Sequence, residues 1–273
     1  MTDVRLRTVD AFTDRPFTGN PAAVLVLDDA PSDEWMAAVA RETGVPDTGF
    51  VIREELADAD FRIRWFTPTV EIDLCGHATL ASAHCLLEDG VQGPIRFASR
   101  SGVLTVSQLA DGSLAMDFPS WPATQIEAPG AVAEAVGVPV EWTGYDAKEF
   151  FLLALASDEA SVRALTPDLN AVAGLDASAL IVTAVADPGQ EYDFVSRLFA
   201  PKVGIPEDPV TGSAHSVLAP FWADRLGRTS LVGLQVSPRS GLVGVQLNGD
   251  RVTITGHAIT VFDGTLSPAA NPR

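Results

Sequence analysis

The chain has 273 residues, of which 47% are hydrophobic and 20% charged, so it can build a packed core and is not of the disordered class. Its net charge of −18 repels phosphate backbones and anionic lipid surfaces, which excludes nucleic acid and membranes as expected partners. A small-molecule substrate is the partner that remains.

The sequence starts without a basic segment followed by an apolar run, and no stretch approaches about twenty consecutive apolar residues. We therefore expect a cytoplasmic protein. The two cysteines, Cys75 and Cys85, would lie roughly 15 Å apart in one helix at about 1.5 Å per residue, beyond disulfide reach. The four histidines lack zinc-ligand spacing, so no structural zinc site is predicted.

The first half of the chain combines strand patterns with two helical patterns. Ser32 is placed to cap a helix that Gly44 ends, and residues 76–87 form a second helical pattern that is apolar nearly all round. Such a helix should be buried inside a curved sheet. Residues 101–118 predict a hairpin turning at Asp111-Gly112. The predicted strands of this half are 4–9, 22–27, 50–52 and 61–66.

The second half begins with a proline-rich segment, 119–129, which we expect to cross between two lobes. A second apolar helix is predicted from Thr211 to about Arg225, and Pro220 should bend or interrupt it. The tail after Gly264 is expected to fray. Strands are predicted at 150–155, 179–185 and 192–199.

Motifs of the first half recur in the second at similar spacing. Arg64-Trp65-Phe66-Thr67-Pro68 matches Arg197-Leu198-Phe199-Ala200-Pro201, and Arg100-Ser101-Gly102 matches Arg239-Ser240-Gly241. Phe66 to Phe199 is 133 positions, Gly76 to Gly212 is 136, and the third offset is 139. Collinear matches of this kind indicate a duplicated unit.

The duplication and the excess of strands predict an α+β fold of two pseudo-symmetric lobes, each a curved β-sheet or barrel around a central helix. We place the N-terminal lobe at 1–118, with the C-terminal strand 259–273 as a candidate to complete it, and the C-terminal lobe at 119–258.

The two glycine turns are the first candidates for chemistry. A turn that delivers a helix N-terminus presents unpaired backbone amides, which suit a carboxylate or an oxyanion. Gly76 and Gly212 would together grip a small acid, or they would only allow helix and sheet to approach closely. His77 and Ser213 follow the two glycines, and a histidine there can donate or relay a proton near neutral pH.

Aspartates precede both glycines. Asp73 and Asp208 each suit either an N-terminal cap or a catalytic carboxylate, and we favour capping for Asp73 and the site for Asp208. His84 and His215 lie further along their helices, where packing or hydrogen-bond networks are expected.

Three longer motifs then resemble one known family. The chain resembles the PhzF phenazine-biosynthesis-like isomerases in three signatures. They are Asp10-Ala11-Phe12 with Phe17-Thr18-Gly19-Asn20-Pro21-Ala22-Ala23-Val24, then Asp73-Leu74-Cys75-Gly76-His77-Ala78-Thr79-Leu80, and Glu207-Asp208-Pro209-Val210-Thr211-Gly212-Ser213-Ala214-His215. The resemblance spans nearly the whole chain. It implies the diaminopimelate epimerase fold, a cleft between two barrel-like lobes, commonly a homodimer, and proton transfer at carbon without a cofactor.

The resemblance also implies roles for single residues. The family's catalytic acid/base is a glutamate in a Glu-Thr-x-Phe-Val context, where this chain has Asp47-Thr48-Gly49-Phe50-Val51. Asp47 inherits the role with a side chain one methylene shorter, and a shift of order 1 Å can cost roughly a hundredfold in rate. His77, Asp208 and Ser213 are implied to lie beside the reacting carbon.

The main expectation is an isomerase that moves a proton between carbons of a small carboxylate-bearing substrate. The expected substrate-binding residues are Asn20, Gly76, Gly212, Cys75 and Thr211. Fold relatives that racemise amino acids use two opposed thiols, one before each glycine, whereas this chain has Cys75 and Thr211. Two alternatives remain open: a racemase, epimerase or dehydratase that pairs Cys75 with an oxygen base, and a non-catalytic protein that binds small acids.

Overall fold

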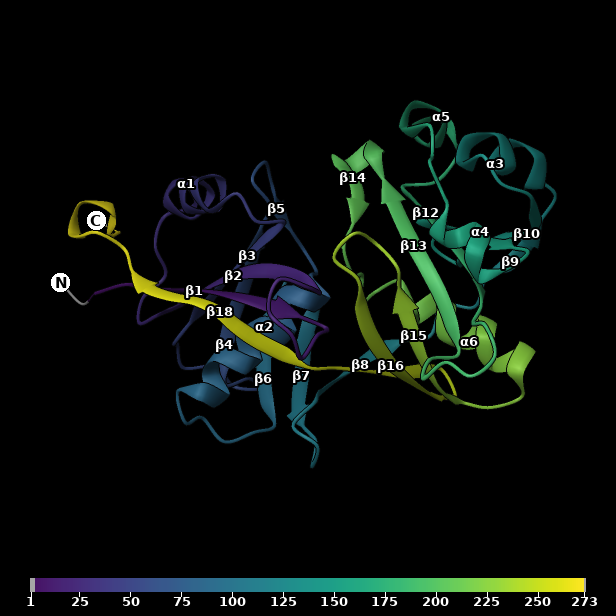
Figure 1. Ribbon diagram of the computed structural model, residues 1–273. Helices are drawn as coiled ribbons and strands as arrows, with labels where there is room; N and C mark the ends of the chain where they lie inside the picture. The colour runs from purple at the N-terminus through teal and green to yellow at the C-terminus, as the bar shows by residue number, and fades with distance from the viewer. Residues whose placement is uncertain (1–2, 273) are drawn as a thin grey trace. The chain divides into compact units, whose positions relative to one another are not determined.

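The computed structural model describes residues 3–272, and its contacts divide the chain into two units. Unit 1 comprises the residues up to Asp117 together with those from Thr255 onward, and unit 2 is Phe118–Ile254. Strands dominate both units and helices are few, which confirms the predicted α+β class (Figure 1). No helix within residues 3–272 has the length and apolar character needed to cross a membrane.

The strands of unit 1 pair in the order β18, β1, β2, β3, β4, β6, β7, β8. The pairs β2–β3 and β4–β6 are parallel, the other pairs of this series are antiparallel, and β5 lies antiparallel to β4. The bounds are β1 (Arg5–Ala11), β2 (Asn20–Leu27), β3 (Asp47–Ile52), β4 (Phe61–Phe66), β5 (Glu71–Ile72), β6 (Ile95–Ser99), β7 (Gly102–Gln108), β8 (Leu114–Pro119) and β18 (Ala258–Thr265).

Helix α2 (Gly76–Glu88) lies in the concave face of this sheet, against β1, β2, β3 and β18 (Figure 1). All its residues from Gly76 to Ala83 are buried. This confirms the expectation for a helix that is apolar nearly all round, because residues 76–83 leave no face for water. Helix α1 (Asp33–Thr43) packs outside, with the predicted Ser32 cap and a left-handed Gly44 at its end.

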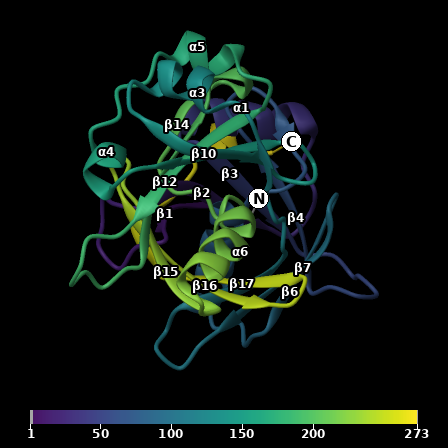
Figure 2. The ribbon, with the colours of Figure 1, turned by 90° about the vertical axis from the view of Figure 1, so that its right-hand side faces the viewer.

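Unit 2 repeats this pairing pattern. Its strands pair in the order β9, β10, β11, β12, β13, β15, β16, with parallel pairs at β11–β12 and β13–β15. Figure 2 shows the central helix α6 of this unit, which packs on β15 and β16. The bounds are β9 (Thr124–Ile126), α3 (Pro129–Val136), β10 (Val140–Tyr145), β11 (Phe151–Ala156), α4 (Glu159–Arg163), α5 (Leu169–Gly174), β12 (Ala179–Val185), β13 (Phe194–Ala200), β14 (Ile205–Asp208), α6 (His215–Leu226), β15 (Ser230–Gln235), β16 (Gly241–Asn248) and β17 (Arg251–Gly256).

Equivalent ion pairs mark the duplication in three dimensions. Arg64 on β4 makes a two-pronged contact with Glu71 on β5, at 2.7 Å for both hydrogen bonds. Arg197 on β13 makes the same contact with Glu207, at 2.7 and 2.9 Å. Each guanidinium also lies over the phenylalanine two residues on, 5.2 Å from its ring centroid in unit 1 and 5.1 Å in unit 2.

Pro220 lies inside helix α6 without interrupting it, contrary to the expected break. Proline lacks the amide that would bond the carbonyl four residues earlier, so the Ser216 carbonyl needs another donor. The backbone amide of Trp121 supplies it at 2.9 Å. A residue nearly a hundred positions away in sequence thus donates the hydrogen bond that Pro220 cannot give to this carbonyl.

Two expectations about irregular segments are wrong. The segment 119–129, expected to cross between the lobes, lies within unit 2, which begins at Phe118, and it contains β9, which pairs with β10. Proline content cannot indicate such a contact between segments. The described part of the tail, residues 265–272, is held by hydrogen bonds rather than frayed. The Leu266 amide donates to the Val4 carbonyl at 2.9 Å, and the Trp35 indole donates to the Ala270 carbonyl at 2.8 Å.

Candidate active site

Four of the predicted site residues meet within unit 1. Asn20 is the first residue of β2, Asp47 is the first residue of β3, and the two strands run parallel with Ala22 opposite Asp47. Cys75 and His77 flank Gly76, the first residue of α2. The sheet and the helix therefore bring the starts of three elements to one place, which we call the unit 1 cluster.

His77 is the centre of the unit 1 cluster. Its Nε2 lies 3.4 Å from Oδ2 of Asp47, and its Nδ1 lies 3.2 Å from Nδ2 of Asn20. The Cys75 Sγ lies 3.5 Å from Nδ1 and 4.0 Å from Nε2. Because the Asn20 amide donates to Nδ1, the ring proton is on Nε2 and faces the Asp47 carboxylate.

The unit 1 cluster is almost dry. Asp47 and His77 are each 5% exposed and Cys75 is 6% exposed. Burial lowers the pKa of His77 from 6.5 to about 3, because the charged imidazolium would lose its hydration there. His77 is therefore a neutral imidazole at neutral pH, able to donate from Nε2 and accept at Nδ1.

A glycine sets the separation between Asp47 and His77. Gly49 lies two residues along β3 from Asp47, with helix α2 directly over it. A Cβ on Gly49 would lie 2.7 Å from the Ser82 hydroxyl oxygen and 3.5 Å from the Ala78 carbonyl oxygen. The absence of a side chain at Gly49 thus lets the strand that carries Asp47 approach the helix that carries His77.

We expect Gly49→Ala to destabilise the protein by about 1–3 kcal/mol, because the added methyl overpacks the contact between β3 and α2. Urea unfolding followed by circular dichroism measures the change. Gly174→Ala is the matched control, since a Cβ at Gly174 meets nothing within 4 Å and should leave the unfolding free energy unchanged or raise it. Equal stability of both variants and the parent chain would contradict the proposed packing role.

A second polar cluster lies in unit 2, at the ends of β14 and β15. Asp208 is 8% exposed and accepts a hydrogen bond from the Thr211 hydroxyl. The Gln235 side chain, which is 1% exposed, donates to the Asp208 carbonyl at 2.7 Å and accepts from the Thr211 amide at 2.9 Å. These three residues form the unit 2 cluster.

Gln235 was not among the predicted site residues. It ends a strand and belongs to no motif, and its contact with the residues before α6 arises only from the parallel pairing of β13 and β15. A sequence shows no sign of such a pairing, because the partners are far apart in the chain.

The chain enters α6 by a tight turn, which corrects the predicted helix start at Thr211. The amides of His215 and Ser216 donate to the carbonyls of Gly212 and Ser213, each three residues earlier, at 3.0 Å. Such tight bonds make Thr211–Ala214 a turn rather than α-helix. Gly212 is buried and Ser213 is half-buried in this turn.

His215 anchors the turn, as expected for a network residue. Its Nδ1 lies 2.9 Å from the Thr211 carbonyl, and burial lowers its pKa from 6.5 to about 4. Asp73, in contrast, does not cap α2. Cys75 occupies the N-cap position, and the exposed Asp73 carboxylate pairs instead with Arg100 at 3.6 Å. The two-residue strand β5 and the turn after it carry the Asp73 side chain outward, which the motif spacing could not show.

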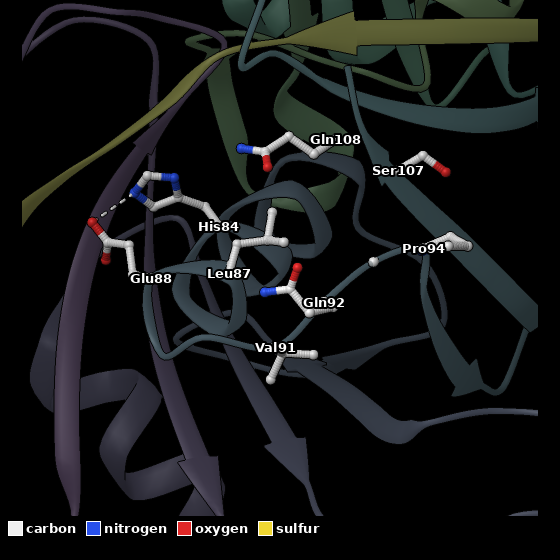
Figure 3. A pocket seen from close by; sticks show the side chains of 9 residues that line it. His84, Leu87, Glu88, Val91, Gln92, Pro94, Ser107 and Gln108 are labelled. Atoms are coloured by element: carbon white, nitrogen blue, oxygen red, sulfur yellow. Dashed lines mark ion pairs between the residues drawn. The ribbon is translucent and has the colours of Figure 1, made fainter. Parts of the chain in front are cut away.

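A cavity of about 500 Å³ opens at the other end of α2 (Figure 3). His84 and Glu88 lie on its wall and pair at 3.2 Å, so His84 is the network residue that the sequence predicts. Its remaining lining residues are Leu87, Val91, Gln92, Gly93, Pro94, Ser107 and Gln108. This cavity contains no member of the unit 1 cluster.

The comparisons with known proteins agree with one another. The model of the family described as phenazine biosynthesis-like protein, PhzC-PhzF, matches residues 9–264. An uncharacterized isomerase of Pseudomonas aeruginosa is 46% identical over 260 residues, which cover 94% of this chain and 96% of that protein.

Solved structures extend the comparison. A PhzF-family phenazine biosynthesis protein of Enterococcus faecalis is 38% identical with a TM-score of 0.91, covering 97% of this chain and all of that chain (100%). A hydroxyproline epimerase of Agrobacterium vitis, 15% identical with a TM-score of 0.59, covers 98% of this chain and 94% of that chain and shares the fold.

Proposed function

Because the chain is an isomerase of the phenazine biosynthesis-like family, we propose that it moves a proton between two carbons of a small carboxylate-bearing substrate without a cofactor. The observation that carries the proposal is the buried pair of Asp47 and His77, at 3.4 Å, within a cluster of polar side chains. A carboxylate held in a nearly dry site beside a neutral imidazole suits proton abstraction from carbon.

Asp47 is the proposed base. Its carboxylate takes the proton from a carbon next to an unsaturated or carboxylate group, and the electron pair left behind delocalises into that group. The carboxylic acid proton of Asp47 exchanges with solvent, and Asp47 then delivers a proton to a second carbon of the same molecule, so the product has the same composition as the substrate. His77 donates from Nε2 towards the carboxylate and holds it in position throughout.

The start of α2 is the proposed binding place for the substrate carboxylate. The N-cap residue Cys75 gives the helix no side-chain cap, so the first amides from Gly76 onward can donate to an anion that also meets the positive end of the helix dipole. Asn20 orients the imidazole through Nδ1 and fixes its tautomer.

The proposal includes the second half of the repeat. With the 136-position offset of the glycines, Thr211, Gly212 and Ser213 correspond to Cys75, Gly76 and His77. We assign Gly212 and Thr211 to substrate binding, and Asp208 and Ser213 to the same proton transfer. The hydrogen bond from Thr211 to Asp208 supports a shared task for the unit 2 cluster.

Solvent exchange tests the function directly. The protein is incubated in deuterium oxide with a panel of small unsaturated carboxylic acids, and carbon-bound deuterium is measured by mass spectrometry in substrate and product. We expect one deuteron at a new carbon position for the true substrate class, and none with the double variant Asp47→Asn/His77→Gln. Binding of an acid without any exchange would support the non-catalytic alternative instead.

One contact favours the second candidate function, a racemase or dehydratase that uses a thiol. The Cys75 Sγ lies 3.5 Å from a nitrogen of His77, close enough for proton exchange between them. At the corresponding place in unit 2, however, Thr211 offers a hydroxyl that is already bonded to Asp208. Deuterium exchange in Cys75→Ala distinguishes the thiol mechanism from the Asp47 mechanism, and Cys85→Ala is the control at a second buried cysteine. Exchange that survives in both variants excludes the thiol mechanism.

A further inference from the structure

The unit 1 cluster also has the chemical make-up of a transition-metal site. Asp47, Cys75 and His77 offer one carboxylate oxygen, one sulfur and one imidazole nitrogen, and these three atoms all lie within 4.8 Å of one another. We infer that Asp47, Cys75 and His77 bind a thiophilic divalent cation of the Zn²⁺ class, and that this cation blocks the proposed base.

The spacing of the three side chains is close to that of a tetrahedral site. Zinc bonds of about 2.3 Å to sulfur and about 2.0–2.1 Å to nitrogen or oxygen put sulfur and nitrogen roughly 3.5 Å apart, and nitrogen and oxygen roughly 3.3 Å apart. In the structure Sγ lies 3.5 and 4.0 Å from the two ring nitrogens, and Oδ2 lies 3.4 Å from Nε2. With Nε2 as the nitrogen ligand, the sulfur lies 4.0 Å away and all three ligand atoms lie within 4.8 Å of one another, so side-chain shifts of up to roughly 1 Å complete the site.

The charges and ligand types select the kind of cation. A thiolate, an imidazole and a carboxylate match the borderline-soft ions Zn²⁺ and Co²⁺, whereas Mg²⁺ and Ca²⁺ require sets of oxygen ligands. Binding releases one proton from the Cys75 thiol, and the thiolate and the Asp47 carboxylate together balance two positive charges. A buried ion is then left without net charge.

The surroundings favour binding as well. Three protein ligands leave a fourth position open for water or for a substrate carboxylate, as in catalytic zinc sites. When Nε2 binds the cation the ring proton lies on Nδ1, and the Asn20 side chain, 3.2 Å from Nδ1, turns its amide oxygen to accept from it and so orients the imidazole. The net charge of −18 raises the local concentration of cations around the chain.

None of this spacing is visible as a sequence motif. Asp47 lies 28 positions before Cys75, far from the short intervals of zinc fingers, and the three side chains meet only because β3 packs on α2. The prediction that the chain lacks a structural zinc site concerns metal that holds a fold together. The inferred site is of another kind, since strands and helix build it without metal.

Cobalt titration tests the inference without using activity. Co²⁺ added to the reduced full-length protein is expected to produce a thiolate-to-cobalt charge-transfer band that saturates at one equivalent, and Zn²⁺ should displace it. Cys85→Ser is the matched control, because Cys85 is also free and buried but lies ten residues after Cys75, within α2. The band should persist in Cys85→Ser and vanish in Cys75→Ser.

Three further variants keep the test decisive if Cys75→Ser fails to fold by circular dichroism. Asp47→Asn and His77→Gln both retain the thiol and should each weaken Co²⁺ binding at least about tenfold, and Asn20→Ala should weaken it roughly 10- to 100-fold. A band absent from the parent chain, a band of full strength in Cys75→Ser, or parent affinity in both Asp47→Asn and His77→Gln would overturn the inference.

The inhibitory consequence rests on the proposed function, whereas the binding does not. Zinc should stop deuterium exchange at one equivalent, and a chelator should restore it. A chain that shows the cobalt band but no exchange with any acid would refute the proposed function and leave the metal site standing. Deuterium exchange without a cobalt band would support the proposed function and refute the metal site.

Discussion

Replacing Asp47 by asparagine is expected to lower the rate of deuterium exchange by roughly 10²- to 10⁴-fold, the range that a positioned general base contributes. The carboxamide has nearly the shape of the carboxylate and can still meet the His77 Nε2, so the fold should be unchanged. What disappears is the ability to take a proton. Initial rates of exchange at saturating substrate, measured by mass spectrometry, give the effect.

The control for Asp47→Asn is Asp73→Asn, which removes an aspartate from the same unit at a side chain that is 70% exposed. It should exchange at nearly the parent rate. Asp47→Glu adds a methylene and restores the side-chain length expected for the family. Because a misplaced base costs roughly a hundredfold for a shift of about 1 Å, the glutamate variant reports how closely the site fits the shorter residue. Parent-like exchange in Asp47→Asn would remove Asp47 from the mechanism.

Acid is expected to destabilise the protein from about pH 6.5 downward, well before its carboxylates are protonated. Burial lowers the pKa of His77 to about 3 and that of His215 to about 4, from 6.5. Between those values and 6.5 the unfolded chain binds protons that the folded chain does not. The free energy of unfolding therefore falls as the pH falls, by up to about 1.4 kcal/mol per pH unit for each histidine.

Urea unfolding at several pH values between about 5 and about 7.5 measures this slope, and the window separates histidines from carboxylates. The pKa of Asp60, for example, is lowered from 3.8 by its hydrogen bonds with Arg96, so its stabilising effect is lost only at more acidic pH. His215→Gln, which removes one of the two buried histidines, should reduce the slope. An unfolding free energy that stays constant from about pH 7 to about pH 5 would contradict the neutral burial of both histidines.

Much of the fold follows from local signals. Ser32 and Gly44 bound a helix because a side-chain cap and a left-handed glycine act within a few residues. The apolar pattern of α2 predicts a buried helix for the same reason. Local patterns do not predict contacts between distant segments. Two examples are the pairing that makes 124–126 a strand and the Trp121 amide that lets a helix continue through Pro220.

The candidate site likewise combines residues that local motifs predict with features that depend on contacts between distant segments. The motifs predict Asn20, Asp47, Cys75 and His77, and the structure shows that these four share one cluster, with His77 in contact with the other three. The burial that keeps His77 neutral comes from the packing of several strands, so no local pattern predicts it. Gln235 is the site residue that the sequence did not predict, because a glutamine at a strand end shows no motif until its partner strand is known.

The return of strand β18 to β1 has a consequence for synthesis. All of unit 2 lies within Phe118–Ile254, whereas the sheet of unit 1 needs residues 258–265 to pair with β1. On the ribosome, the middle of the chain therefore has every residue it needs before the first part can finish. Until the last strand emerges, β1 is an open edge beside helix α2, the helix that carries His77. Completion of the sheet of unit 1 thus waits for residues 258–265, which emerge after all of unit 2.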